Sequence, residues 1–182
     1  MDISFEDLTF EILHNGSTLT SFSCENADLY EFLIEDALSS QKKKLSVTRL
    51  AIYRDEVVGF FTLVNDCIET KAIAASDSDH GYPYARYPAM KIARLATHDD
   101  YRGRDIGTNM LLKVLIIFCR ISEYVGCRFM TVDSKPEAAG FYQKFGFKTA
   151  QRHYTDTVPM YKNYPFEETG AETRHLSEFR DA

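Results

Sequence analysis

Short apolar runs bounded by turn residues predict where the strands of the chain lie. In the first half, residues 8–16 form one such run, which ends in an Asn-Gly turn, and residues 47–66 form another, which folds back at Arg54-Asp55. Later runs predict further strands over residues 89–98 and 128–134 and a hairpin-like end over residues 146–154 and 157–164. Between these strands, residues 69–88 contain glycine, proline and three tyrosines and predict a long loop, a kind of segment that is often functional.

Apolar residues at helical spacing predict three helices. The first covers residues 24–44, with acidic residues crowded at its start and Lys42 to Lys44 at its end, where their charges suit the helix dipole. The second runs from about Ile106 to Tyr124 and is apolar on nearly every side, so we expect it to be buried on more than one face. The third covers residues 135–145, with Pro136 in its first turn.

The length and composition predict one globular domain followed by a tail. The chain has 182 residues, of which 45% are hydrophobic, enough for a core of ordinary size. We expect the domain to cover residues 1–164 and residues 165–182 to form a polar C-terminal tail. No apolar run approaches the ~20 residues that span a membrane, and the acidic N-terminus does not resemble a secretion signal. Four scattered cysteines without a CxxC pair are typical of reduced thiols, so we expect a cytoplasmic protein.

Charge is unevenly spread along the chain. The formal net charge is −6, yet residues 1–41 contain nine Asp or Glu and no Lys or Arg. The remaining residues therefore carry 21 basic and 18 acidic side chains. The N-terminal quarter would repel a phosphate backbone, whereas the rest of the chain is able to bind a compact anion.

The segment YRGRDIGT, residues 101–108, follows the predicted strand 89–98 and precedes the long apolar helix. A strand, a tight turn and a helix N-terminus together make an anion site, because the helix dipole and the unpaired N–H groups both point at the ligand. Two glycines permit close backbone approach, and Arg102 and Arg104 add charge and bidentate donors. The alternative is a charged turn in which Asp105 caps the helix.

Two longer stretches, PAMKIARLATHDDYRGRDIGTNML and VDSKPEAAGFYQKFGF, resemble the GNAT superfamily of acetyl-CoA-dependent N-acetyltransferases. The family pattern is a strand, a Q/R-x-x-G-x-G/A pyrophosphate loop, a helix, a strand, and a helix that carries a Tyr before a Gly-Phe. Its order and spacing match from about Pro88 to Phe147. The upstream stretch FSCENADLYEFLIEDA is similar, more weakly, to the toxin-type branch of the family. Asp105 stands where the family has its first loop glycine, and a carboxylate that points inward would weaken pyrophosphate binding.

The resemblance implies an α/β fold: a GNAT-like mixed, mostly antiparallel twisted sheet with helices on both faces and with the cofactor between two splayed central strands. It also implies that acetyl-CoA is bound as a co-substrate. The backbone of Leu95 and Thr97 would pair with the pantetheine arm like another strand, and an amide there would hold the developing oxyanion. The residues that the resemblance places on the cofactor are Leu95, Ala96, Thr97, Arg102, Gly103, Arg104, Asp105, Ile106, Gly107, Thr108, Asp133 and Ser134.

Tyr142 is the catalytic residue that the resemblance favours. The departing CoA thiolate needs a proton or a hydrogen-bond donor, and a phenol suits that role because its pKa lies above that of a thiol. The alternative is that Tyr142 only packs. No Glu lies on the strand AMKIARLATH, where some family members carry one, which leaves His98 as a candidate general base against the alternative of a solvated turn. The five histidines show no metal-ligand spacing, so we expect no metal.

These features predict an acyltransferase that moves the acetyl group of acetyl-CoA to a primary amine by direct attack in a ternary complex. The acidic N-terminal quarter favours a small-molecule or peptide amine as the acceptor. The toxin-type similarity implies an aminoacyl-tRNA instead, which requires a basic patch from Arg86, Lys91, Arg94 and Arg152; no other nucleic acid and no membrane are expected as partners. The sequence is also compatible with a non-catalytic acetyl-CoA-binding module or a pure interaction protein. The apolar helix and the terminal strands leave room for a homodimer.

Overall fold

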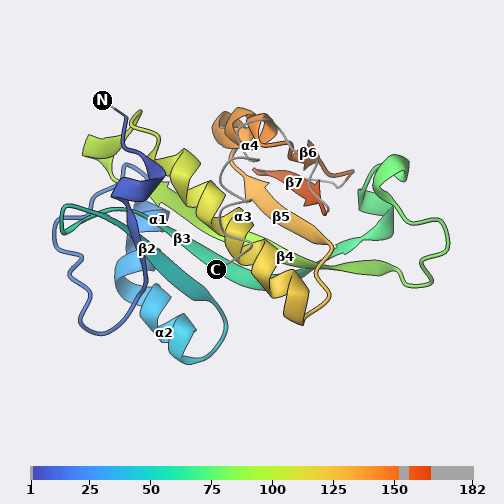
Figure 1. The fold of residues 1–182 in the computed structure, drawn as a ribbon, viewed down its shortest axis with the longest axis horizontal. Coiled ribbons are helices and arrows are strands. Elements are labelled where there is room, and N and C mark those ends of the chain that lie inside the picture. The colour runs from blue at the N-terminus through green and yellow to red at the C-terminus, as the bar shows by residue number, and fades with distance from the viewer. Residues whose placement is uncertain (1, 152–155, 165–182) are drawn as a thin grey trace. The chain divides into compact units, whose positions relative to one another are not determined.

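The sheet of this protein is mixed and mostly antiparallel. The computed structural model describes residues 2–151 and 156–164. Within these residues, seven strands are hydrogen-bonded in the order β1-β2-β3-β4-β5-β7-β6 (Figure 1). Their bounds are β1 Thr9–Ile12, β2 Val47–Tyr53, β3 Glu56–Glu69, β4 Arg86–Thr97, β5 Phe129–Ser134, β6 Lys148–Thr149 and β7 Val158–Asn163. The β4–β5 pair is parallel, and the β1–β2, β2–β3, β5–β7 and β6–β7 pairs are antiparallel, which confirms the predicted α/β class.

The helices lie close to the predicted positions. Their bounds are α1 Ala27–Glu31, α2 Ala37–Lys42, α3 Ile106–Tyr124 and α4 Ala139–Lys144, and short 3-10 turns cover η1 Phe5–Asp7, η3 Thr70–Ala72, η4 Ala75–Asp77, η5 Asp99–Tyr101 and η6 Pro136–Ala138. The predicted helix 24–44 is not regular, because Phe32–Asp36 form a π-helix, η2. In η2 the N–H of Ala37 donates to the carbonyl of Phe32, five residues earlier. No helix in the described ranges is long and apolar enough to cross a membrane.

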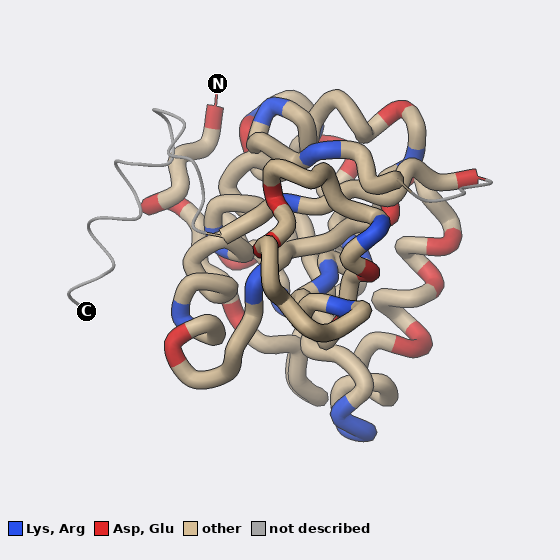
Figure 2. The backbone as a smooth tube through the Cα atoms, turned by 90° about the vertical axis from the view of Figure 1, so that its right-hand side faces the viewer, with Lys and Arg blue, Asp and Glu red and all other residues tan. Residues whose placement is uncertain are grey.

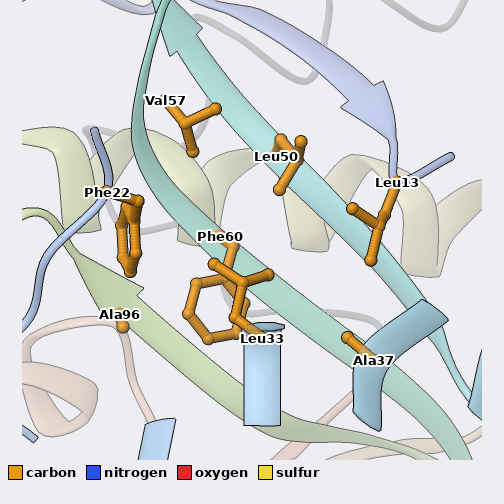
Figure 3. Packing of buried hydrophobic residues seen from close by; sticks show 8 residues of the cluster. All are labelled: Leu13, Phe22, Leu33, Ala37, Leu50, Val57, Phe60 and Ala96. Carbon is orange, nitrogen blue, oxygen red and sulfur yellow. The ribbon is translucent and has the colours of Figure 1, made fainter. Parts of the chain in front are cut away.

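The described chain divides into two compact units, of which the first consists of Met1–Val64 and Ala93–Val114. Its core forms where the helical segment α1–η2–α2 covers β2 and β3 (Figure 3). Leu33 and Ala37 of the helical segment face Leu50 of β2 and Phe60 of β3, and none of these four side chains is more than 1% exposed. Each fully buried Leu or Phe side chain contributes roughly 1.5–3 kcal/mol to folding. Burial of these side chains therefore holds the amphipathic helical segment α1–η2–α2 against the sheet.

Within the described residues, the second unit consists of Asn65–Ile92, residues 115–151 and residues 156–164. Its core is aromatic: the ring of Phe129 in β5 lies 5.2 Å from that of Tyr87 and 5.8 Å from that of Tyr161 in β7. The ring of Tyr82 stacks on Tyr87 at 4.0 Å, so the tyrosines of the predicted loop 69–88 partly cover the sheet. This loop is shorter than predicted, because β3 continues to Glu69 and β4 begins at Arg86.

Some expectations lie outside the described residues. The predicted polar tail 165–182 is one of them, and Arg152 of the predicted basic patch is another. A single cooperative domain over residues 1–164 stays a prediction. The four cysteines, which are all described, are half-buried.

Candidate functional site

The start of α3 packs closely against β3 and β4 at Gly59. A Cβ atom at this position would lie 2.8 Å from the Sδ atom of Met110 and 3.0 Å from the carbonyl oxygen of Ala96. The first distance is shorter than any normal contact of a Cβ atom, so this close approach requires glycine. Ala96 is buried, and the predicted cofactor residues Leu95 and Thr97 on either side of it are half-buried. The strand that is expected to bind pantetheine is thereby held against the first turns of α3.

The turn before α3 contains two residues in the left-handed backbone region. Gly103 and Asp105 both have positive φ angles, of 71° and 63°. The N–H of Asn109 donates to the carbonyl of Asp105 at 3.0 Å, so Asp105 is the residue from which the helix starts. As at the start of any α-helix, the amides of the three residues between them, Ile106 to Thr108, have no acceptor within the helix, and amides in this position are able to bind an anion. The side chain of Asp105 is exposed. The alternative in which this side chain caps the helix stays a prediction.

Asp105 adopts the left-handed conformation that glycine supplies in the family pattern. Among residues with a side chain, Asp and Asn tolerate this region best. The replacement therefore keeps the path of the turn and changes its charge. The predicted weakening of pyrophosphate binding by Asp105 stays a prediction.

The N-terminal segment is hydrogen-bonded to this turn and to the start of α3, a feature that sequence reasoning missed. The N–H of Ile3 donates to the carbonyl of Arg104 at 3.1 Å, and the Nδ2 atom of the buried Asn109 donates to the carbonyl of Ile3 at 2.8 Å. The only sign of this contact in the sequence was Asn109, a polar residue in the first turn of an otherwise very apolar helix. Its partner lies 106 residues away in sequence, which no local pattern reveals.

The two arginines of the turn differ in their availability. Arg102 donates from Nη1 to Oε2 of Glu25 at 2.6 Å, and its Nη2 atom lies 2.9 Å from Oδ1 of Asp99. The hydrogen bond to Glu25 raises the pKa of Arg102 above its ordinary value. Arg104 is exposed, and its guanidinium lies 5.2 Å from the ring centroid of Tyr101. The charge of Arg102 is thus already balanced, whereas Arg104 presents its cation without a carboxylate from the described part of the chain.

His98 has hydrogen bonds at both ring nitrogens. Its Nδ1 atom accepts from the N–H of Asp100 at 3.1 Å, so the proton lies on Nε2, which donates to the carbonyl of Ser21 at 2.7 Å. The ring is buried and packs edge-on against Phe22 and Tyr101, with ring centroids 5.6 Å apart in both cases. Neither the solvated turn nor an accessible base describes this environment. The hydrogen bonds favour a structural role in which His98 fixes the chain before the turn.

Asp133 and Ser134 lie at the end of β5. Asp133 forms an ion pair with Lys91 of β4, so this lysine of the predicted basic patch is not free. Ser134 is buried, and its Oγ atom donates to the carbonyl of Lys135 at 2.8 Å. Both polar side chains thus have partners within the protein, and their assignment to the cofactor stays a prediction.

Tyr142 lies in α4 and packs against two aromatic side chains. Its ring centroid is 5.1 Å from that of Phe141 and 5.4 Å from that of Phe147, and the residue is 6% exposed. None of the described residues hydrogen-bonds the Tyr142 hydroxyl. Burial raises the pKa of this phenol, so it stays protonated at neutral pH and is able to donate.

The end of α4 is fixed by residues from elsewhere. Lys162 of β7 is buried, and its Nζ atom donates to the carbonyl of Phe145 at 2.6 Å, where α4 ends. Gly146 follows with a φ of 77°, which closes the helix in the usual left-handed conformation. A cation at a helix C-terminus is favoured by the helix dipole. These contacts hold the short helix that carries Tyr142.

The described residues offer no group of three or more His, Cys, Asp or Glu side chains that could hold a metal.

A family model described as an acetyltransferase (GNAT) domain matches residues 46–149. Similar solved structures include a tyrosine-to-phenylalanine variant of KacT, with 21% identity and a TM-score of 0.78 over 86% of this chain and 95% of that chain. AtaT complexed with acetyl-methionyl-tRNAfMet has 22% identity and a TM-score of 0.78 over 86% and 95% of the two chains. AtaTR bound with AcCoA has 22% identity and a TM-score of 0.72 over 87% and 94%. These likenesses show the fold.

The matched range is more than half of the chain and includes β4, the turn, α3 and α4. The chain belongs to the GNAT family of acetyltransferases, which take their acetyl group from acetyl-CoA.

Proposed function

We propose that this chain is an N-acetyltransferase that moves the acetyl group of acetyl-CoA to a primary amine by direct attack. The observation that carries the proposal is the turn between β4 and α3. Its positive φ angles at Gly103 and Asp105 and the open amides of the first turn of α3 form a site for a compact anion. The pyrophosphate of a coenzyme A derivative is such an anion.

The residues of the first unit would bind the cofactor. The amides of Ile106 to Thr108 would donate to the pyrophosphate, and the exposed guanidinium of Arg104 would add a charge. The backbone of Leu95 and Thr97 would pair with the pantetheine arm, with one of its amides directed at the thioester oxygen. The close packing at Gly59 supports this role, because it keeps β4 and the start of α3 at a constant separation.

Acetyl-CoA, when bound, supplies a thioester; the amine nitrogen forms a bond to its carbonyl carbon, the carbon–sulfur bond breaks, and the amine loses a proton. Tyr142 would donate a hydrogen bond to the leaving thiolate. Its raised pKa makes it a hydrogen-bond donor more than a strong acid, since the phenol holds its proton firmly. His98 has no free lone pair in this structure, which supports attack by an already neutral amine or proton loss through water.

Two acceptors have support. AtaT is seen with acetyl-methionyl-tRNAfMet, and the likeness of its fold to this chain supports the α-amine of an aminoacyl-tRNA. Acidic residues follow one another along α1–η2–α2, with lysines only at the C-terminal end (Figure 2), which supports a small cationic amine or a peptide N-terminus. We favour the aminoacyl-tRNA, because the likeness extends over most of both chains.

Calorimetric titration with acetyl-CoA, beside CoA and ADP, tests the cofactor site first. One-to-one binding that ADP reproduces in part is expected, and no binding at millimolar ligand would overturn the assignment of the turn. Transfer of labelled acetyl groups is then measured to a set of charged tRNAs and to a panel of amines and peptides. Label on the tRNA alone supports the favoured acceptor, and label on the panel alone supports the small amine or peptide. Binding without transfer to any acceptor would identify a non-catalytic acetyl-CoA-binding module.

A further inference from the structure

Arg94 of β4 is the described member of the predicted basic patch that lacks an acidic partner. Arg86 lies 3.9 Å from Glu69, and Lys91 pairs with Asp133. The guanidinium of Arg94 instead lies 5.0 Å from the ring centroid of Phe32, and its Nη1 atom donates to the carbonyl of Ala93 at 2.7 Å. Its side chain is exposed, and no carboxylate of the described residues pairs with it.

The position of Phe32 adds a second and independent observation. Phe32 is the first residue of the π-helix η2, and such segments are rare and frequent at functional sites. The π-helix keeps Leu33 and Ala37 in the core while the helical register changes around them. Phe32 is half-buried and packs on the same core, so its ring is a fixed surface for the guanidinium.

Arg94 forms no ion pair although the helical segment that carries Phe32 also carries acidic residues. Asp28, Glu31 and Glu35 are exposed and form no ion pair with it. A guanidinium has five N–H donors in a planar fork, and Arg94 uses one hydrogen bond to the adjacent backbone carbonyl. Stacking on an aromatic ring orients the fork while its edge stays open, which suits bidentate binding of an anion.

We propose that Arg94, held by Phe32, is a specificity-determining residue that binds an anionic group of the acceptor, a carboxylate or a phosphate close to the amine. The proposal rests on the proposed acetyl transfer, because Arg94 immediately precedes Leu95 to Thr97, the backbone expected to hold the thioester arm. An acceptor bound through this anion would have its amine near that strand. The site would then favour acceptors that carry an anion beside the amine over amines that carry only positive charge.

Steady-state kinetics with paired acceptors test the role of Arg94. Phosphoethanolamine and glycine carry an anion near the amine, ethanolamine and glycinamide do not, and charged tRNA carries phosphates. For the anionic acceptors, Arg94→Met should raise KM about tenfold with little change in kcat, and Arg94→Lys should recover part of the loss. Phe32→Leu should have a smaller effect in the same direction, and the acceptors without an anion should show no change.

Arg54→Met is the matched control, because Arg54 also lies 5.0 Å from the centroid of a tyrosine ring, in the turn between β2 and β3. Equal effects of Arg94→Met and Arg54→Met on all acceptors would overturn the proposal. An equal loss of kcat/KM with acceptors that carry an anion and with acceptors that lack one would also overturn the proposal, since it would indicate a structural role of Arg94.

A binding measurement decides the proposal even if the chain acetylates no amine. The Nε–H signal of Arg94, identified by its loss in Arg94→Lys, is followed by NMR as acetate or inorganic phosphate is added. A shift with either anion supports the site and shows which anion it prefers, while the Arg54 signal serves as the reference. No shift beyond that of Arg54 with either anion would refute the site. If the wild-type protein transfers no acetyl group but its Arg94 signal shifts clearly, only the proposed function would be refuted.

Discussion

Arg102 and Glu25 form an ion pair with 2.6 Å between Nη1 and Oε2, although they lie 77 residues apart in sequence. Together with the contact from Arg102 to Asp99, this pair occupies the arginine that the family pattern assigns to the pyrophosphate. A cofactor bound at this turn would therefore compete with Glu25 for this guanidinium. The Arg102–Glu25 pair links the segment before α1 to the turn before α3.

We predict that Glu25→Gln tightens the binding of acetyl-CoA about twofold to fivefold, the usual range for an exposed ion pair. The physical reason is that Arg102 loses one competing carboxylate. Calorimetry at low salt measures the effect, which should shrink as salt is added. Glu31→Gln removes the same charge from an exposed position without an ion pair and should leave the affinity nearly unchanged. Weaker binding by Glu25→Gln would show that the pair orders the turn instead of competing for it.

Asp105 provides a test that separates charge from backbone conformation. Asp105→Asn keeps the tolerance for a positive φ and removes the carboxylate, so it should bind acetyl-CoA about threefold more tightly. Asp105→Ala removes the charge but should destabilise the protein by roughly 1–2 kcal/mol, because alanine is strained in the left-handed region. Asp55→Asn, at another exposed residue with a φ of 65°, is the control. Equal affinity of wild type and Asp105→Asn would mean that the carboxylate does not face the ligand.

Tyr142→Phe should lower kcat about a hundredfold and leave the KM for acetyl-CoA nearly unchanged, since the hydroxyl is expected to act on the leaving thiolate. The stability of the protein should not fall, because no described residue bonds this hydroxyl. Tyr124→Phe, at an 87% exposed tyrosine, is the control. A loss of thermal stability together with unchanged kcat would assign Tyr142 to packing alone.

Gly59→Ala should destabilise the fold by roughly 1–3 kcal/mol, because the added methyl group meets Met110 and the carbonyl of Ala96. Urea unfolding measures the change, and acetyl-CoA affinity should fall as β4 and α3 move apart. Gly140→Ala is the matched control, since a Cβ atom there has no neighbour within 4 Å and alanine favours the helix α4. Equal stability of the two variants would show that the contact at Gly59 relaxes without cost.

Tyr161 should make stability depend on pH in the alkaline range. Burial is the main cause that raises its pKa to about 12, and its hydrogen bond to Asp77 adds to the shift. The folded value lies above the ordinary value of 10, so this contribution is complete below about pH 10 and is lost as the pH rises toward 12. Urea unfolding between about pH 8 and 11.5 should show falling stability, less steeply in Tyr161→Phe. An identical slope in the two proteins would contradict this prediction.

The sequence by itself determined the features that arise from residues close together along the chain. The order of strands and helices, the extent of α3 and the turn at Gly103 to Gly107 follow from local hydrophobic periodicity and from turn residues. The positive φ angle of Asp105 also fits its sequence, because tolerance of this backbone region is a property of the residue itself. The spacing of these parts was also enough to reveal the family.

Only the tertiary structure decided which side chains remain available for chemistry. The deciding contacts join residues far apart along the chain. Arg102 pairs with Glu25, and Arg94 stacks on Phe32. His98 is fixed by its two hydrogen bonds, and β7 lies between β5 and β6. The π-helix was missed as well, because its sequence has ordinary helical spacing and its altered register comes with packing. Local patterns encode contacts between residues three or four apart. Contacts across tens of residues form only when the sheet and the helices bury their apolar faces together.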